Sequence, residues 1–182
     1  MTQYVKWQQQ RQPAWKRTLA LVAAFFIFPT GIPWLLLVVL PRWGAGLGWQ
    51  PLHLGVWQDV LGYGAALVGG AFAIWTVWVQ ISWADGTPLP MLPTQKLIIR
   101  GPYRLCRNPM VLGTIKAYGG LAVVSGSAFS LLFVLLFGAG LVAYLPLMEE
   151  KELALRFGAE YEAYKRSTPF LIPRPPFGKR GG

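Results

Sequence analysis

The stretch Met110–Glu150, MVLGTIKAYGGLAVVSGSAFSLLFVLLFGAGLVAYLPLMEE, carries one charged residue, Lys116, before the two glutamates at its end. An apolar run of about 20 residues is long enough to cross a bilayer as a helix. The tripeptide Ser125–Ser127 divides the stretch into two runs, and Ser-Gly-Ser is typical of a tight turn. We therefore expect two membrane helices, 110–124 and 128–148, that form an antiparallel hairpin.

Two further uncharged runs precede this hairpin, at Thr18–Leu40 and at about Val60–Ala84. The first is long and is followed by no small-residue cleavage pattern, so we interpret it as a spanning helix rather than a cleaved signal. Proline and glycine in its middle should kink or break it, at Pro29, Gly31 and Pro33. Four glycines in the second run favour close helix packing: Gly62, Gly64, Gly69 and Gly70. The predicted fold is an all-α membrane bundle of about four transmembrane helices.

Composition supports a membrane protein with one domain. The chain has 182 residues, of which 54% are hydrophobic and 13% charged, whereas soluble domains carry about 25% charged residues. The net charge of +10 comes from basic residues at the ends of apolar runs. That placement favours membrane orientation over nucleic-acid binding. A single cysteine and a single histidine exclude an intrachain disulfide and a multi-histidine metal site, and we predict no metal.

The basic residues also predict the topology. They gather in the N-terminal segment 1–17, in the loop 85–109 and after residue 148, while the loop 41–58 holds only Arg42. Four spans with both termini in the cytoplasm satisfy this distribution. Compact length and short loops favour a bacterial inner membrane. We expect Glu149–Ser167 to form an amphipathic helix on the cytoplasmic face and residues 174–182 to form a mobile tail.

This topology places the basic loop and the two glutamates at the same end of the bundle. Asn108 precedes the third helix and Glu149 ends the fourth, and antiparallel neighbours bring such ends side by side. The polar residues expected there are Arg100, Tyr103, Arg104, Arg107, Asn108, Glu149 and Glu150. Taken singly, each has an ordinary explanation, because juxtamembrane arginines hold orientation and glutamates often begin a solvated helix.

Three other features of the sequence bear on its chemistry. Lys116 suits snorkelling, or else an acidic partner inside the bundle. Cys106 lies between two arginines, which can favour a thiolate, but no histidine stands beside it, so a catalytic cysteine is the weaker interpretation. The glycines of 44–48 resemble a nucleotide loop, but Trp49 occupies the place of the third glycine and no strand precedes them. We reject a dinucleotide site there.

Taken together, the polar residues follow an ordered pattern. It runs Gly101-Pro102-Tyr103-Arg104, Arg107-Asn108-Pro109-Met110, Gly113, an apolar hairpin, Glu149-Glu150, Phe157-Gly158, Tyr161, Tyr164 and Pro169-Phe170-Leu171-Ile172-Pro173. This resembles the isoprenylcysteine carboxyl methyltransferase and phospholipid methyltransferase group of membrane proteins, whose pattern is close to G-P-Y-x-x-x-R-H-P-x-Y and then E-E. The resemblance covers about 97–173. Two positions depart from it: Asn108 stands where histidine is commonest, and Val111 where tyrosine is expected.

The resemblance implies S-adenosylmethionine as cofactor, held at the cytoplasmic face by residues 97–173. The rest of the single domain is then the N-terminus, 1–17, and the first two helices with their loop, 18–96. It implies a cofactor pocket formed by Tyr103, Arg107, Asn108, Pro109, Glu149 and Glu150, with Arg104, Arg107 and Glu149 as catalytic residues. The residue types suit this chemistry. A carboxylate can pair with the cofactor's ammonium and an arginine with its carboxylate, and direct methyl displacement depends chiefly on positioning.

The implied acceptor is lipophilic or amphipathic and arrives from the lipid bilayer: a prenylcysteine carboxylate, a phospholipid amine or another small molecule. The broken first helix and the glycines of the second helix suggest a lateral opening for it. Two alternatives stay open. One is an NADPH-dependent reductase of the sterol-reductase type, which shares a similar hairpin but has more spans. The other is a non-catalytic membrane partner protein, because Asn108 and Val111 depart from the pattern. Binding assays with the two cofactors separate these hypotheses.

Overall fold

The computed structural model describes residues 14–83 and 96–173, and within these residues it is helical with no strand. The predicted N-terminal segment before residue 14 and the predicted tail 174–182 lie outside the described residues. Three helical stretches are long and apolar enough to cross a membrane: Ile27–Gly46, Val56–Trp83 and Ala128–Phe157. A fourth apolar helix, Pro109–Ser125, is shorter. The predicted helical membrane bundle is confirmed.

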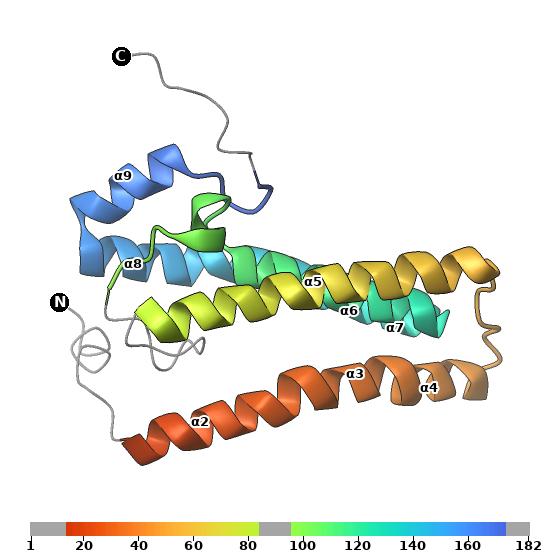
Figure 1. The fold of residues 1–182 in the computed structure, drawn as a ribbon. Helices are drawn as coiled ribbons and strands as arrows, with labels where there is room; N and C mark the ends of the chain where they lie inside the picture. The colour runs from red at the N-terminus through yellow and green to blue at the C-terminus, as the bar shows by residue number, and fades with distance from the viewer. Residues whose placement is uncertain (1–13, 84–95, 174–182) are drawn as a thin grey trace.

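The first span continues through its prolines instead of breaking. It consists of successive segments: α2 (Ala14–Phe26), η1 (Ile27–Gly31), α3 (Ile32–Trp34), η2 (Leu35–Val39) and α4 (Leu40–Gly46). Both η segments are π-helical turns, in which each N–H bonds to the carbonyl five residues earlier. The wider turn accommodates the proline rings that an α-helix would exclude. Figure 1 shows the resulting irregular helix running beneath the other spans.

Two hydroxyl groups from the hairpin satisfy backbone carbonyls in these π-helical turns. The carbonyls of Phe28 and Leu36 would each need an N–H five residues later, and a proline occupies that position in both turns. Tyr118 Oη donates to Phe28 O at 2.7 Å, and Ser130 Oγ donates to Leu36 O at 2.7 Å. Since lipid offers no hydrogen bonds, these contacts attach the first span to the hairpin.

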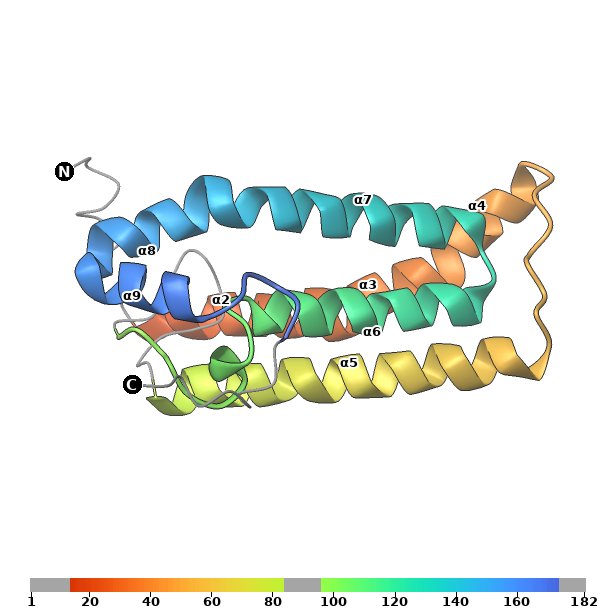
Figure 2. The ribbon, with the colours of Figure 1, turned by 90° about the horizontal axis from the view of Figure 1, so that it is seen from above.

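The remaining spans are α5 (Val56–Trp83), α6 (Pro109–Ser125) and α7 (Ala128–Tyr144). In both views α6 lies between α5 and α7 (Figures 1 and 2). The predicted hairpin is present, because Gly126 turns the chain with φ of +61° and the Ser127 hydroxyl accepts the N–H of Ser130.

Glycines bring α5 and α6 into backbone contact. A Cβ on Gly69 would lie 2.4 Å from Ala117 N, and one on Gly120 would lie 2.4 Å from Gly62 O. The predicted close packing is therefore present at Gly62 and Gly69. It is absent at Gly64, where a Cβ would meet nothing within 4 Å, and the same is true of Gly70. The close contact fixes the position of α5 beside α6.

The polar segment after the hairpin is two helices, not the single helix expected for Glu149–Ser167. α7 passes through a π-helical turn, η4 (Leu145–Glu149), into α8 (Glu150–Phe157), and α9 (Ala159–Ser167) follows. Gly158 separates α8 from α9 with φ of +53°, a conformation that only glycine adopts freely. The turn places α9 beside the loop before α6, as both views show (Figures 1 and 2).

Candidate active site

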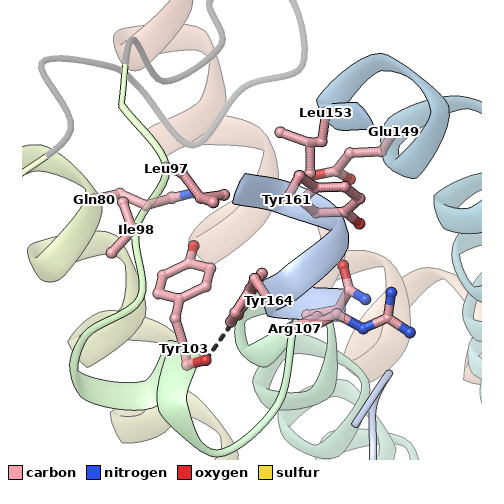
Figure 3. Close-up of a pocket in the computed structure, with 10 residues that line it drawn as sticks. Gln80, Leu97, Ile98, Tyr103, Arg107, Glu149, Leu153, Tyr161 and Tyr164 are labelled. Carbon is pink, nitrogen blue, oxygen red and sulfur yellow. Dashed lines mark hydrogen bonds between the residues drawn. The ribbon is translucent and has the colours of Figure 1, made fainter. Parts of the chain in front are cut away.

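A pocket lies at the end of the bundle where α5 ends and α6 begins. It is bounded by the 3₁₀ turn η3 (Gly101–Arg104), by the end of the long α7–α8 helix and by α9 (Figure 3). The lining residues are Gln80, Leu97, Ile98, Tyr103, Arg107, Asn108, Glu149, Leu153, Tyr161 and Tyr164. Residues from α5, η3, η4, α8 and α9 and from the segments on either side of η3 thus meet in one cavity.

A group of ions centred on a buried carboxylate lies behind the pocket. Arg107 Nη1 forms an ion pair with Glu150 Oε1, and the side chains are 11% and 7% exposed. The second oxygen, Glu150 Oε2, lies 2.9 Å from Lys165 Nζ. A buried carboxylate is tolerated when cations pair with both oxygens in this way. Arg107 of the basic loop and Glu150 therefore lie side by side, as expected from the sequence.

The segment after α9 folds over Arg107 and Asn108. The backbone N–H of Arg107 donates to Pro169 O at 2.9 Å, and Asn108 Nδ2 donates to Phe170 O at 3.0 Å. The Arg107 guanidinium carbon lies 5.6 Å from the centroid of the Phe170 ring, within cation–π range. These contacts hold the guanidinium in place at the pocket. They also give Asn108 a structural role, as a tie between the loop and the C-terminal segment.

Three tyrosines supply neutral phenol groups to the pocket. Tyr164 Oη donates to Tyr103 O at 2.7 Å, which joins α9 to η3 (Figure 3). Burial, with a smaller contribution from nearby Glu150, raises the pKa of Tyr161 to about 12. Burial also raises the pKa of Tyr103 and of Tyr164 well above the usual tyrosine range. All three side chains are therefore protonated hydrogen-bond donors near neutral pH.

Cys106 is buried, with no exposed surface, in the loop between η3 and α6. Burial raises the pKa of its thiol despite the neighbouring arginines. The raised pKa opposes the thiolate that a nucleophilic cysteine needs. The structure therefore gives no support to the catalytic-cysteine interpretation.

The predicted site residues occupy three different environments. Four of them line the pocket: Tyr103, Arg107, Asn108 and Glu149. Glu150 lies behind Arg107 as its ion-pair partner, and Pro109 is buried as the first residue of α6. Arg104 is exposed at the end of η3 and is not among the lining residues.

Sequence reasoning missed two polar residues of the site. Lys165 of α9 completes the ion group, and Gln80 of α5 lines the pocket. Gln80 lies three residues before the end of α5, a membrane helix with few polar side chains. A polar side chain in a membrane helix is expensive and usually has a function, so its position was a usable signal. Lys165 had no such signal, because it is one of several cations on a polar helix.

Two buried polar atoms of the lining have no hydrogen-bond partner among residues 14–83 and 96–173. They are Gln80 Oε1 and Arg107 Nε. Buried polar groups are nearly always paired, so an unpaired one calls for an explanation. One atom is an acceptor and the other carries a donor hydrogen, and both residues line the same pocket. A ligand in the pocket that offers a donor and an acceptor would satisfy both.

A curated relative shares part of this sequence. Over 139 residues the chain is 32% identical to "Methanethiol S-methyltransferase 2" of Bradyrhizobium diazoefficiens. The match covers 69% of this chain and 52% of the relative, so the chain spans about half the length of the curated relative that it matches.

A family model also matches a continuous part of the fold. The model for phospholipid methyltransferases matches residues 57–160, from the first turn of α5 to the beginning of α9. This range includes η3, the hairpin, Arg107 and both glutamates, and it is more than half of the chain. The protein therefore belongs to the phospholipid methyltransferase family of membrane methyltransferases.

Proposed function

We propose that the protein uses S-adenosylmethionine to methylate a lipophilic or amphipathic acceptor that reaches the site from the membrane. One observation carries the proposal: a buried arginine with an unpaired Nε and the carboxylate of Glu149 line the same pocket. That pair is complementary to the amino-acid end of the cofactor, which carries a carboxylate and an ammonium group.

The residues present fit this cofactor. Arg107 would bind its carboxylate through the Nε hydrogen, while Glu150 holds the other end of the guanidinium. Glu149 would pair with its ammonium group, and the phenol groups of Tyr103 and Tyr161 can donate to its neutral acceptor atoms. When bound, the cofactor supplies a methyl group on a positively charged sulfur.

The chain's own contribution is positioning. Methyl displacement needs the acceptor and the methyl group in line, and holding two reactants in that geometry is worth several orders of magnitude in rate. The segment after α9 fixes Arg107 from one side and Glu150 fixes it from the other. In this proposal Arg107 and Glu149 contact the cofactor, Tyr103 and Asn108 line its pocket, and Pro109 and Glu150 support them. Arg104, exposed on η3, receives no contact in the pocket.

The surroundings of the site complete the proposal. In this proposal the pocket lies on the cytoplasmic side, both termini are cytoplasmic and the spans lie in a bacterial inner membrane; the basic residues of the loop before α6 support this orientation. The acceptors considered are a prenylcysteine carboxylate, a phospholipid amine and another small molecule. Similarity to a relative that is named for methanethiol adds a small thiol to these classes.

Calorimetric binding of S-adenosylmethionine to the full chain in nanodiscs tests the proposal. We expect a dissociation constant in the micromolar range for the wild type. Glu149→Gln should weaken binding by about 10- to 100-fold, the usual worth of a charge-assisted hydrogen bond. Glu160→Gln removes the same charge from an exposed position of α9 and should leave binding unchanged.

Each alternative predicts a different result in the same assay. Failure of folded wild type to bind S-adenosylmethionine contradicts the proposal, and binding of NADPH instead supports the reductase. Binding of S-adenosylmethionine without release of S-adenosylhomocysteine, across carboxylate, amine and thiol acceptors, supports the non-catalytic partner protein.

A further inference from the structure

The pocket has two sides with different chemistry (Figure 3). Arg107 and Glu149 lie on a side formed by the beginning of α6 and by α8 and α9. Gln80 lies with Leu97 and Ile98 on the other side, formed by the end of α5 and the segment that leads to η3. Ile98 is 8% exposed and Leu97 is half-buried, so this side is mainly apolar. Gln80 is its polar member.

The unpaired oxygen of Gln80 is an exception on its own helix. Thr76, one turn earlier on α5, is fully buried, and its hydroxyl donates to Phe72 O at 2.9 Å. The protein therefore satisfies a neighbouring buried polar group locally while Gln80 Oε1 has no partner among the described residues. A Cβ on Gly113 of α6 would lie 2.8 Å from Ala73 N, so α5 is in backbone contact with α6 two turns before Gln80.

We propose that Gln80 Oε1 binds the methyl acceptor, and that the acceptor is a neutral nucleophile that still carries a hydrogen: a thiol, an amine or a hydroxyl group. An amide oxygen only accepts hydrogen bonds, so it requires a donor from the ligand. A carboxylate acceptor carries no such hydrogen, and its charge would be poorly solvated beside Leu97 and Ile98. The inference rests on the proposed function, which gives the charged side of the pocket to the cofactor.

The geometry of a single hydrogen bond suits the reaction. With its hydrogen on Gln80, the nucleophilic atom keeps a lone pair free to face the methyl group. The bond from this atom to the methyl carbon forms as the methyl–sulfur bond breaks. The electron pair of the broken bond stays on sulfur, and the proton of the nucleophile passes to water. The atoms and charges balance without an oxidant or a reductant.

The test measures cofactor and acceptor binding separately, by calorimetry on the full chain in nanodiscs. S-adenosylmethionine is titrated first. The protein loaded with S-adenosylhomocysteine, which cannot turn over, is then titrated with 1-butanethiol, butyl methyl sulfide or butyrate. These probes share an alkyl chain, and only the thiol carries a donor hydrogen on its nucleophilic atom. The variants are Gln80→Leu and, as a matched control on the same face of α5, Thr76→Val.

We expect wild type to bind the thiol at least about tenfold more tightly than the sulfide or butyrate, the size of one buried hydrogen bond. Gln80→Leu should lose about tenfold in thiol affinity and keep its affinity for S-adenosylmethionine. Thr76→Val should change neither. Should Gln80→Leu fail to fold, Gln80→Met replaces it with a side chain of similar length.

Several results overturn the inference. They are the absence of measurable thiol binding, butyrate binding as tight as thiol binding, and thiol affinity that Gln80→Leu leaves unchanged. Loss of S-adenosylmethionine affinity in Gln80→Leu, with thiol affinity kept, assigns Gln80 to the cofactor instead and also overturns it. Failure of the wild type to bind S-adenosylmethionine contradicts the proposed function itself. Failure of the acceptor hypothesis is therefore distinguishable from failure of the proposed function.

Discussion

Arg107 is the residue on which most contacts of the site converge. Its guanidinium pairs with Glu150, its backbone N–H donates to Pro169, and its side chain lies over the Phe170 ring. One residue thus links the loop before α6, the end of the hairpin and the C-terminal segment. Its loss should affect stability and ligand binding together, whereas loss of the exposed Arg104 should affect neither.

We expect Arg107→Gln to lower the free energy of unfolding by about 1–3 kcal/mol, because buried Glu150 loses its buried partner and keeps the ion pair with Lys165, whose side chain is 41% exposed. S-adenosylmethionine binding should be lost in the same variant. Arg104→Gln, which removes the same charge from the surface, should stay within about 0.5 kcal/mol of wild type. Denaturant titration in mixed micelles and calorimetry give the two readouts. Equal effects of the two substitutions would contradict the placement of Arg107.

Asn108 makes a separate prediction about the C-terminal segment. Asn108→Ala removes the donor to Phe170 O and should cost about 1 kcal/mol, the net value of one hydrogen bond. Limited proteolysis should then cut the segment after α9 faster than in wild type. Glu162→Ala, at an exposed position of α9, is the control. An unchanged cutting rate in Asn108→Ala would mean that the segment is held by its other contacts alone.

At this scale the sequence predicted part of the site and missed the rest for a physical reason. Charged residues beside membrane helices stand out, so Arg107, Glu149 and Glu150 were found from position alone. Gln80 had a signal, as a polar side chain near the end of a membrane helix, but the sequence does not show which residues it faces. Lys165 is one cation among many and does not stand out until α9 is placed in space.

Helix positions follow directly from the apolar runs, but helix geometry does not. α5, α6 and α7 begin and end within a few residues of the predicted bounds. The π-helical turns of the first span depend on hydroxyl groups 90 and 94 residues away, which no local pattern shows. Likewise, the division of α8 from α9 depends on one glycine with positive φ.

The α5–α6 contact predicts unequal effects of identical substitutions. Gly69→Ala places a methyl group 2.4 Å from a backbone nitrogen of α6, so we expect a loss of about 2 kcal/mol or more. Gly64→Ala, on the same helix with open space around it, should be neutral or slightly stabilising. Denaturant titration in mixed micelles compares the two. A similar loss in both variants would show that glycine matters here for helix flexibility rather than for close packing.

The pocket, α8 and α9 lie together at one end of the bundle. The loop after α4 lies at the opposite end, beside the hairpin turn at Gly126 (Figure 2). Three helical stretches are long enough to cross a membrane, and α6 is shorter. The proposed topology adds α6 as a fourth crossing, since an even number of crossings returns the chain to the side where it began.

Cysteine labelling tests this arrangement, because the native Cys106 is buried and should stay unreactive. We expect Gln50→Cys and Glu160→Cys, both at exposed positions, to react with a membrane-impermeant maleimide from opposite faces of intact vesicles. Glu160→Cys should react from the cytoplasmic face. Reaction of both from the same face would show that α5 and the hairpin do not cross as described.

The two hydroxyl bonds to the first span also have a consequence for biogenesis. Ribosomes synthesise Phe28 and Leu36 long before Tyr118 and Ser130 exist, so the nascent first helix enters the bilayer with two carbonyl groups that lack their final partners. It must remain beside the insertion machinery, or in a thinned and hydrated patch of lipid, until the hairpin emerges. Assembly of this protein is therefore completed from its C-terminal half, and nascent chains truncated before Tyr118 should be favoured substrates of membrane quality control.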